Sequence, residues 1–154
     1  MKTGVGAACP IARSLAVVGE KWALLIVRDA MAGATRFAQF RSSLGIAPDV
    51  LADRLGKLVD QGILERRSYR SPGERARAEY VLTATGRDLG SVLAALGGWG
   101  MTHLPVPDGP PFRFVDRSSG EPARVGFTGA DGRPIPGENV VLLRREQPWV
   151  PSPP

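Results

Sequence analysis

The sequence predicts a mainly α-helical fold with a small β-hairpin wing, followed by a short β-rich extension. Apolar residues recur at helical spacing through much of residues 10–99, and one basic hairpin pattern interrupts them. Composition then changes sharply, because 11 of the 14 prolines fall in residues 105–154. We therefore expect one helical domain over residues 1–104 and a Pro-rich extension over residues 105–154.

The first part of the chain predicts two successive helices. Apolar side chains repeat every three or four positions from Ile11 to Met31, with a break at Gly19. This spacing gives each helix one apolar side that can face a core. We expect the helices over residues 10–18 and 21–32.

A short third helix is expected after Gly33. Thr35 is its expected N-cap, because a threonine hydroxyl can accept a hydrogen bond from an exposed amide of the first turn. Phe37 and Phe40 then lie on one side of the helix, and Gly45 is placed to end it.

The fourth helix is predicted to begin at Pro48 and to end at Gly62. Proline is favoured in a first helical turn, and glycine is favoured just beyond the last one. The spacing separates a core side from an opposite, polar side. The core side comprises Leu51, Leu55, Leu58 and Val59, and the opposite side carries Asp49, Asp53, Lys57 and Asp60, flanked by Val50, Arg54 and Gln61.

A hairpin and a fifth helix complete the domain. Residues 63–70 and 78–82 have strand character and flank a turn at residues 71–74. Thr83 can cap a helix whose apolar stripe continues to Trp99. Four helices, a basic hairpin and a last helix, in that order, indicate a winged helix-turn-helix.

The extension shows no helical pattern. Three short apolar stretches are expected to form strands, separated by turns that contain glycine. The stretches are residues 112–115, 124–127 and 140–143, and the turns are residues 118–120 and 130–132. The alternative is a partly disordered Pro-rich tail, although side chains such as Phe114, Phe127 and Trp149 give it something to bury.

The formal charge of +5 is unevenly distributed. Residues 1–104 carry 14 Lys or Arg against 9 Asp or Glu, whereas residues 105–154 carry 6 of each. A basic domain suits a partner rich in phosphate. Charge alone leaves nucleic-acid binding and an ordinary basic surface both open.

Several classes of protein are not expected. The longest apolar run, residues 22–27, is too short to cross a bilayer, and the N-terminus does not resemble a secretion signal. The single cysteine, Cys9, cannot form an intramolecular disulfide, so we expect a cytoplasmic protein. His103 has no second histidine or cysteine pair for zinc, and no catalytic constellation is visible. We expect no metal, no cofactor and no enzyme activity.

A series of short motifs links the chain to a known family. They lie at residues 9–13, 19–26, 36–37, 50–51, 54–55, 62–66, 79–80, 82–83, 86–87 and 99–100. Together they resemble the HxlR-type bacterial transcriptional regulators, which are related to the MarR group. The resemblance implies a homodimeric winged helix, expected to act as a repressor, that binds a pseudo-palindromic site in double-stranded DNA.

In such a protein the fourth helix is the recognition helix and the hairpin is the wing. Arg54 and Lys57 can bond guanine or phosphate, and Asp53 can accept a hydrogen bond from cytosine. The expected DNA contacts are Pro48, Asp49, Val50, Asp53, Arg54 and Lys57 in the helix, and Arg36, Arg66, Arg67, Arg70, Arg75 and Arg77 in the wing and its flank. The alternatives are a solvated polar face, an Arg54 bonded within the fold, and a partly paired hairpin.

Two positions depart from the pattern of the family. Ala47 stands where relatives usually have serine, and alanine is a poor N-cap. Asp49 stands where many relatives have a basic residue. Asp49 can therefore take over part of the capping and face its own backbone instead of DNA.

The resemblance also implies a dimer interface and a candidate sensor. The interface residues are Ile11, Leu15, Leu89, Val92, Leu93, Leu96 and Trp99. Cys9 precedes Pro10 at the start of the first helix, where the helix dipole and Arg13 favour a thiolate. Some relatives sense electrophiles or oxidants through a cysteine at this position. The alternative is a buried, unreactive thiol at the dimer interface.

The extension resembles a small zinc ribbon found in some actinobacterial relatives. Cysteine pairs would stand near residues 118–120 and 128–132, and every such cysteine is absent here. We expect a metal-free version that packing against the core must hold.

The sequence thus favours a cytoplasmic, homodimeric, sequence-specific DNA-binding regulator under the control of a small-molecule or redox signal. Two alternatives stay open: a ligand-independent architectural DNA binder and a winged helix that binds protein. The first would show a small ratio of specific to non-specific affinity. The second would bind DNA weakly even at low salt.

Overall fold

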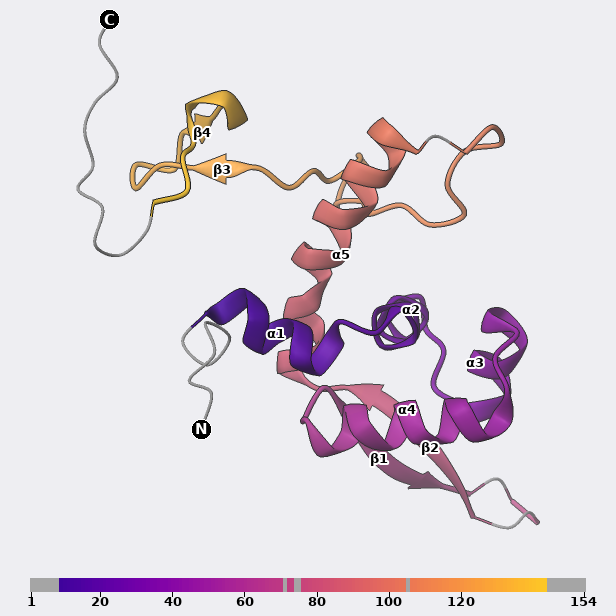
Figure 1. The fold of residues 1–154 in the computed structure, drawn as a ribbon. Coiled ribbons are helices and arrows are strands. Elements are labelled where there is room, and N and C mark those ends of the chain that lie inside the picture. Colours follow the sequence, from indigo (N-terminus) through magenta and orange to yellow (C-terminus); the bar gives the residue numbers. More distant parts are fainter. Residues whose placement is uncertain (1–8, 71, 74–75, 105, 144–154) are drawn as a thin grey trace, which may run out of the picture. The chain divides into compact units, whose positions relative to one another are not determined.

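The computed structural model describes residues 9–70, 72–73, 76–104 and 106–143, and it confirms the mainly α-helical fold with a β-hairpin wing. The elements are α1 (Pro10–Val18), α2 (Lys21–Met31), α3 (Phe37–Leu44), α4 (Pro48–Asp60), β1 (Leu64–Tyr69), β2 (Arg77–Leu82), α5 (Ala84–His103), β3 (Phe127–Thr128), β4 (Pro134–Ile135) and a 3₁₀ turn (Gly137–Asn139) (Figure 1). The chain forms two compact units, residues 1–93 and 94–154. Because this division falls within α5, the expected domain boundary at residues 104 and 105 stays a prediction.

A single hydrophobic core holds the first unit together. The three leucines expected on the inner side of α4 are all buried, and they meet apolar residues of α2 and α3. The buried apolar residues are Val18, Ala23, Ile26, Val27, Phe40, Ile46, Leu51, Leu55, Leu58, Ile63, Leu64 and Leu93. Burial of these side chains against one another fixes the orientation of α4 and therefore decides which of its residues face solvent.

The start of α3 differs from the expectation. Arg36, not Thr35, is the N-cap residue, and the Gln39 Oε1 atom accepts hydrogen bonds from the amides of Thr35 at 2.9 Å and Arg36 at 2.8 Å. The Thr35 carbonyl oxygen instead accepts a bond from the Tyr80 amide at 2.7 Å. Pairing with the wing thus takes Thr35 away from the cap. At the other end of α3, Gly45 adopts φ 60°, the left-handed conformation that glycine favours.

The wing is an antiparallel pair of strands beside α4 (Figure 1). Its register runs from Leu64 opposite Leu82 to Tyr69 opposite Arg77. An additional bridge joins Arg36 to Glu79, so the segment before α3 lies along the outer side of β2. The paired strands therefore have neighbours on both sides, the segment before α3 along β2 and α4 beside β1.

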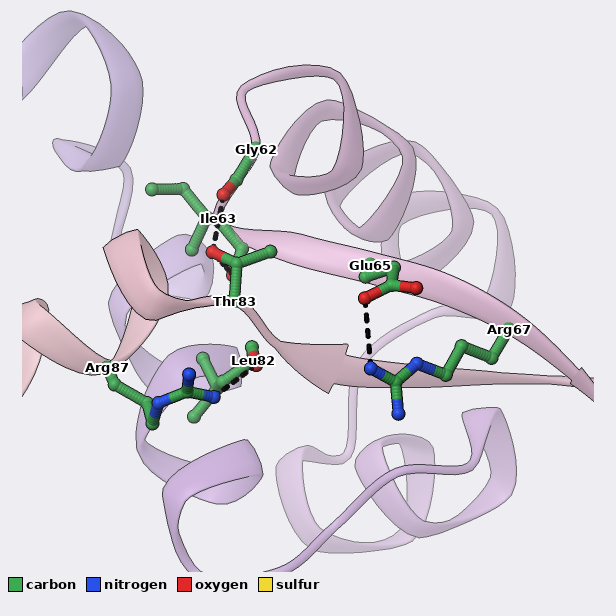
Figure 2. A network of polar contacts seen from close by, with 7 residues as sticks. All are labelled: Gly62, Ile63, Glu65, Arg67, Leu82, Thr83 and Arg87. Carbon is green, nitrogen blue, oxygen red and sulfur yellow. Dashed lines mark hydrogen bonds and ion pairs between the residues drawn. The ribbon is translucent and has the colours of Figure 1, made fainter.

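A set of polar contacts joins the wing to α5 (Figure 2). The Thr83 hydroxyl donates a hydrogen bond to the Gly62 carbonyl oxygen at 2.6 Å, and Arg87 donates to the Leu82 carbonyl oxygen at 2.8 Å. The Thr83 oxygen also accepts a bond from the Gly86 amide at 3.1 Å, as expected of a helix cap. The end of α4, the base of the wing and the start of α5 thus form one hydrogen-bonded joint.

The extension contains fewer strands than expected. Strands were expected at residues 112–115, 124–127 and 140–143, but only short pairings occur, between β3 and β4 and between Val115 and Pro122. Val115 and Phe127 each fall within an expected stretch, so two of the expectations are met in part. Residues 140–143 form no strand, because no partner strand lies beside them in the described part of the extension. No residue between 106 and 143 is buried. Trp149 lies outside the described residues.

Two aspartates close the turns of the extension. The Asp116 Oδ1 atom accepts hydrogen bonds from the amides of Ser118 at 2.8 Å and Ser119 at 2.9 Å, and from both serine hydroxyls. Bonds from Ser118 and Ser119 lower the pKa of Asp116 to about 2. Asp131 accepts a bond from the Arg133 amide at 3.1 Å and pairs with its guanidinium. Side-chain carboxylates thus organise both turns.

Candidate nucleic-acid interface

The entrance of α4 carries an unpartnered carboxylate. Pro48 occupies the first turn, and Ala47 is the N-cap residue without a side-chain hydrogen bond. Asp49 is exposed and makes no hydrogen bond or ion pair with any residue in the described part of the chain. The expectation that Asp49 caps its own helix is therefore not met. Its charge is favoured only by the positive end of the helix dipole, so the carboxylate is available to an outside partner.

The solvent side of α4 is more acidic than the sequence suggested. Exposed residues recur at helical spacing along it and include the predicted contacts Pro48, Asp53 and Lys57. The complete exposed set is Pro48, Asp49, Ala52, Asp53, Gly56, Lys57 and Asp60. Lys57 pairs with Asp53 at 2.9 Å, which leaves this side with three carboxylates against one ammonium group. Attraction for phosphate must therefore come from other elements.

Arg54 does not stand at the centre of this side. Its guanidinium forms ion pairs with Glu20 at the start of α2 and, at 3.0 Å, with the neighbouring Asp53. The side chain is 19% exposed, and its Nε atom is buried without a hydrogen-bond partner. The structure thus favours the alternative in which Arg54 is bonded within the fold, and its contact with DNA stays a prediction. Val50 is half-buried and packs against the core, so it too is turned from solvent.

The wing supplies the positive charge. The predicted contacts Arg66, Arg67, Arg70 and Arg77 are all exposed, and Arg75 lies outside the described residues. Arg66 makes no hydrogen bond or ion pair within the described residues, whereas Arg67 bonds Glu65 at 3.0 Å (Figure 2). The hydrogen bond from Arg67, with the attraction of its charge, lowers the pKa of Glu65 and raises that of Arg67. Arg66 is therefore a cation of the wing with no described acidic partner.

Arg36 links α3 to the wing. Its guanidinium lies 4.6 Å from the ring centre of Tyr69, within the range of a cation–π contact. This contact places another exposed cation beside the hairpin. Sequence reasoning selected Arg36 as a flank of the wing, and the structure brings it there. Contact with DNA stays a prediction for all of these arginines.

Sequence reasoning missed Glu20, Ala52 and Gly56. Ala52 and Gly56 could have been found, because the same helical spacing that selects Asp49 and Asp53 selects them. Both are small and leave the helix backbone accessible on its solvent side. No local pattern in the sequence could have selected Glu20, because it lies 34 positions before its partner Arg54.

The predicted dimer residues fall into two groups. Ile11 and Leu15 on α1 and Val92, Leu96 and Trp99 on α5 are between 48% and 65% exposed, unusual for large apolar side chains. Leu93 and Leu89 differ from the expectation, because Leu93 is buried in the core of a single chain and the half-buried Leu89 packs against that core. These two residues stabilise the protomer.

Cys9 and His103 have plain surroundings. Cys9 is a half-buried free thiol at the N-cap position of α1, and its carbonyl oxygen accepts a bond from the Arg13 amide at 3.0 Å. The His103 ring lies 5.0 Å from that of Trp99. Within the described ranges no group of three or more His, Cys, Asp or Glu could hold a metal ion, and no helix there is long and apolar enough to span a membrane.

Comparison with known proteins agrees with this geometry. The uncharacterized HTH-type transcriptional regulator Rv3095 of Mycobacterium tuberculosis is 43% identical over 113 residues, 73% of this chain and 70% of that protein. The crystal structure of PA1607, a candidate transcription factor, superposes with a TM-score of 0.77 at 42% identity over 90% of this chain and 96% of that one. The structure of the redox regulator HypR in its reduced form superposes with a TM-score of 0.55 at 29% identity. The match covers 61% of this chain and 92% of that one.

The match to a family is equally direct. Residues 17–108 match the HxlR-like helix-turn-helix, a stretch that includes α2 to α5 and the whole wing. The structure agrees with this match, because it contains a helix-turn-helix whose outer helix is exposed and a wing that carries arginines. The chain belongs to the HxlR family of helix-turn-helix transcriptional regulators.

Proposed function

We propose that this regulator is a cytoplasmic repressor that binds a pseudo-palindromic DNA site as a homodimer. The observation that carries the proposal is the pairing of an exposed α4 with an arginine wing in one helix-turn-helix. The wing arginines supply attraction for phosphate, and the small and acidic residues of α4 face the bases. Carboxylates accept hydrogen bonds from the amino group of cytosine, so Asp49 and Asp53 join Lys57 as candidate reading residues.

The dimer is supported by exposed apolar surface on two helices. Ile11 and Leu15 lie one turn apart on α1, and Val92, Leu96 and Trp99 form a stripe on α5. Such stripes are costly in water and are typical of helix pairs between subunits. Two copies related by a twofold axis would present two α4 helices to half-sites about one helical turn apart.

Selection of bound duplexes from random DNA, followed by a salt titration, tests the proposal. We expect an inverted repeat, bound at least about 10³-fold more tightly than random DNA of the same length. Val92→Glu, on the apolar stripe of α5, should weaken dimers and the affinity for the full repeat. Ser91→Glu, which adds the same charge at an exposed position about 100° around the same helix, is the matched control. A ratio of specific to random affinity near one would contradict the proposal and favour the architectural DNA binder.

The signal that releases the repressor is proposed to be a small molecule or an oxidant acting at Cys9. The support is the position of the thiol at the start of α1 and the likeness to HypR, a redox regulator. DNA affinity measured before and after diamide treatment tests the redox branch, with Cys9→Ser as control. Loss of affinity in the parent chain alone is the expected result. Equal affinities before and after treatment would remove the sensor role.

A second candidate function is a winged helix that binds protein. The acidic solvent side of α4 is the observation that favours it, because three carboxylates repel phosphate. Such a module would bind DNA weakly even at low salt. An affinity for DNA that rises steeply as the salt concentration is lowered would support the DNA-binding role instead.

A further inference from the structure

The two sides of the wing differ in chemistry. Residues directly opposite each other in an antiparallel pair lie on the same side, and neighbours along a strand alternate between sides. One side, called here the inner side, carries Leu64, Arg66, Ser68, Ala78, Tyr80 and Leu82. The other, called the outer side, carries Glu65, Arg67, Tyr69, Arg77, Glu79 and Val81.

The inner side of the wing faces the reading helix. Leu64 is buried in the core that contains the leucines of α4, and Tyr80 and Leu82 pack against that core. The α4 helix therefore lies on the inner side of the hairpin. A duplex that touches the exposed residues of α4 and the wing together approaches from this side, and the outer side points away from it.

An uncompensated charge stands on the inner side. Arg66 is the one charged residue of that side within the paired strands, and it makes no hydrogen bond or ion pair with any described residue. The outer side carries two arginines and two glutamates, and Arg67 bonds Glu65 at 3.0 Å (Figure 2). The charges of the outer side therefore cancel in number, whereas the exposed Arg66 can offer its full charge to a phosphate group.

Arg36 holds the outer side of the wing from the start of α3. Its guanidinium lies 4.6 Å from the ring centre of Tyr69, which belongs to the outermost residue pair of the strands. The bridge between Arg36 and Glu79 and the hydrogen bond from the Tyr80 amide to the Thr35 carbonyl oxygen fix the same segment along β2. Because a two-stranded ribbon is only marginally stable by itself, the contact with Tyr69 stabilises the part of the wing that lies farthest from the core.

We propose that the paired strands of the wing bind the phosphate backbone of DNA through Arg66 on the inner side, and that Arg36 is a positioning residue that acts through Tyr69. Arg36 and Arg67 then maintain the shape of the wing and contact no phosphate. The proposal rests on the proposed function and narrows its wing contact to one side of the strands. Arg70 and Arg75 follow β1, beyond the paired residues, and are not part of it.

Salt titration of binding to a duplex of random sequence tests the role of Arg66. Each phosphate contact that is lost reduces the slope of log affinity against log salt by about 1. Arg66→Gln should therefore reduce the slope by about 1, whereas Arg67→Gln, the same change one position along the strand, should leave it unchanged. Arg117→Gln, which removes an exposed cation from the extension, is the control outside the wing. Equal slopes for Arg66→Gln and Arg67→Gln would overturn the choice of side.

Tyr69→Leu tests the role of Arg36 without changing any charge. An exposed cation–π contact changes an equilibrium by a factor of about two to five. We expect the affinity for DNA to fall by this factor at an unchanged salt slope, and amide hydrogen exchange over β1 and β2 to become faster by the same factor in the DNA-free chain. Arg36→Gln should have the same effects, and the double variant should do no more than either change alone. A salt slope reduced by Arg36→Gln, or exchange unaffected by Tyr69→Leu, would overturn the positioning role.

Failure of this proposal and failure of the proposed function give different results. A chain that binds no duplex even at low salt contradicts the proposed function and the Arg66 contact with it, and the exchange measurement then decides the role of Arg36 in the wing. A chain that binds DNA with equal slopes for Arg66→Gln and Arg67→Gln contradicts the choice of side alone.

Discussion

A methyl group added at Gly86 should destabilise the fold, because the space beside this residue is already filled. A Cβ atom built there would overlap the carbonyl oxygen of Ile63 and would lie 2.9 Å from the Cδ2 atom of Leu82. Carbon atoms in ordinary contact are roughly 3.5–4.0 Å apart. The clash falls on backbone at the base of the wing, where a side chain cannot rotate away. Gly86→Ala should therefore push α5 from the joint that Thr83 holds.

The expected loss of stability follows from the contacts at that joint. Overpacking costs about 1–3 kcal/mol, and loss of a helix cap costs about 1 kcal/mol. The Gly86 amide donates to Thr83 at 3.1 Å, so displacement of α5 weakens that cap as well. Alanine recovers up to about 1 kcal/mol by its higher helix propensity. We expect a net loss of about 2 kcal/mol in the free energy of unfolding.

Gly56→Ala in α4 is the matched control. The same methyl group there meets no atom within 4 Å, so only the gain in helix propensity of about 0.5–1 kcal/mol should appear. Urea unfolding at one fixed protein concentration measures both variants, because the stability of the proposed dimer would depend on concentration. The midpoint should fall by about 1 M for Gly86→Ala and rise slightly for Gly56→Ala. A Gly86→Ala protein as stable as the parent would refute the reasoning.

The remaining predictions concern the interface and the extension. Arg54→Met should lower the free energy of unfolding by about 1–2 kcal/mol, and Lys57→Met by less than about 1 kcal/mol. The reason is that Arg54 is mostly buried and Lys57 is not. Equal losses of stability in urea unfolding would contradict this prediction. Arg66→Gln should weaken specific and random DNA alike and reduce the salt slope by about 1, and a change in sequence preference at an unchanged slope would count against a phosphate contact. The turn at Asp116 should be intact above pH 3.8 and be lost as the pH falls through about 2, because hydrogen bonds lower the pKa of this carboxyl. The rate of amide hydrogen exchange at Ser118, measured against pH, reports whether the turn is formed. A midpoint near pH 4 would contradict the hydrogen bonds that Asp116 accepts from Ser118 and Ser119.

Most of the helix-turn-helix could be predicted because its signals are local. The α1 helix occupies residues 10–18 as expected, and α4 begins at Pro48 as expected. Apolar spacing, proline and glycine act within a few residues, so one sequence suffices to find them. The burial of Leu51, Leu55 and Leu58 follows from the same spacing.

The strands of the extension were predicted poorly for the opposite reason. A strand is stabilised by hydrogen bonds to a partner, and the partner cannot be read from a stretch such as residues 140–143. Thr35 shows the same limit within the first unit. Its local pattern predicts a cap, but its carbonyl oxygen bonds Tyr80, 45 positions further on.

The sequence by itself determined the family, the order of the elements and the inner side of α4, since each depends on periodicity or on motifs in a fixed order. Tertiary structure decided the chemistry of the outer side. Packing of α4 against α2 places Arg54 beside Glu20, removes it from the centre of the exposed side and leaves Asp49, Asp53 and Asp60 there. An ion pair between residues 34 positions apart exists only because the core brings their helices together, and no local pattern encodes that distance.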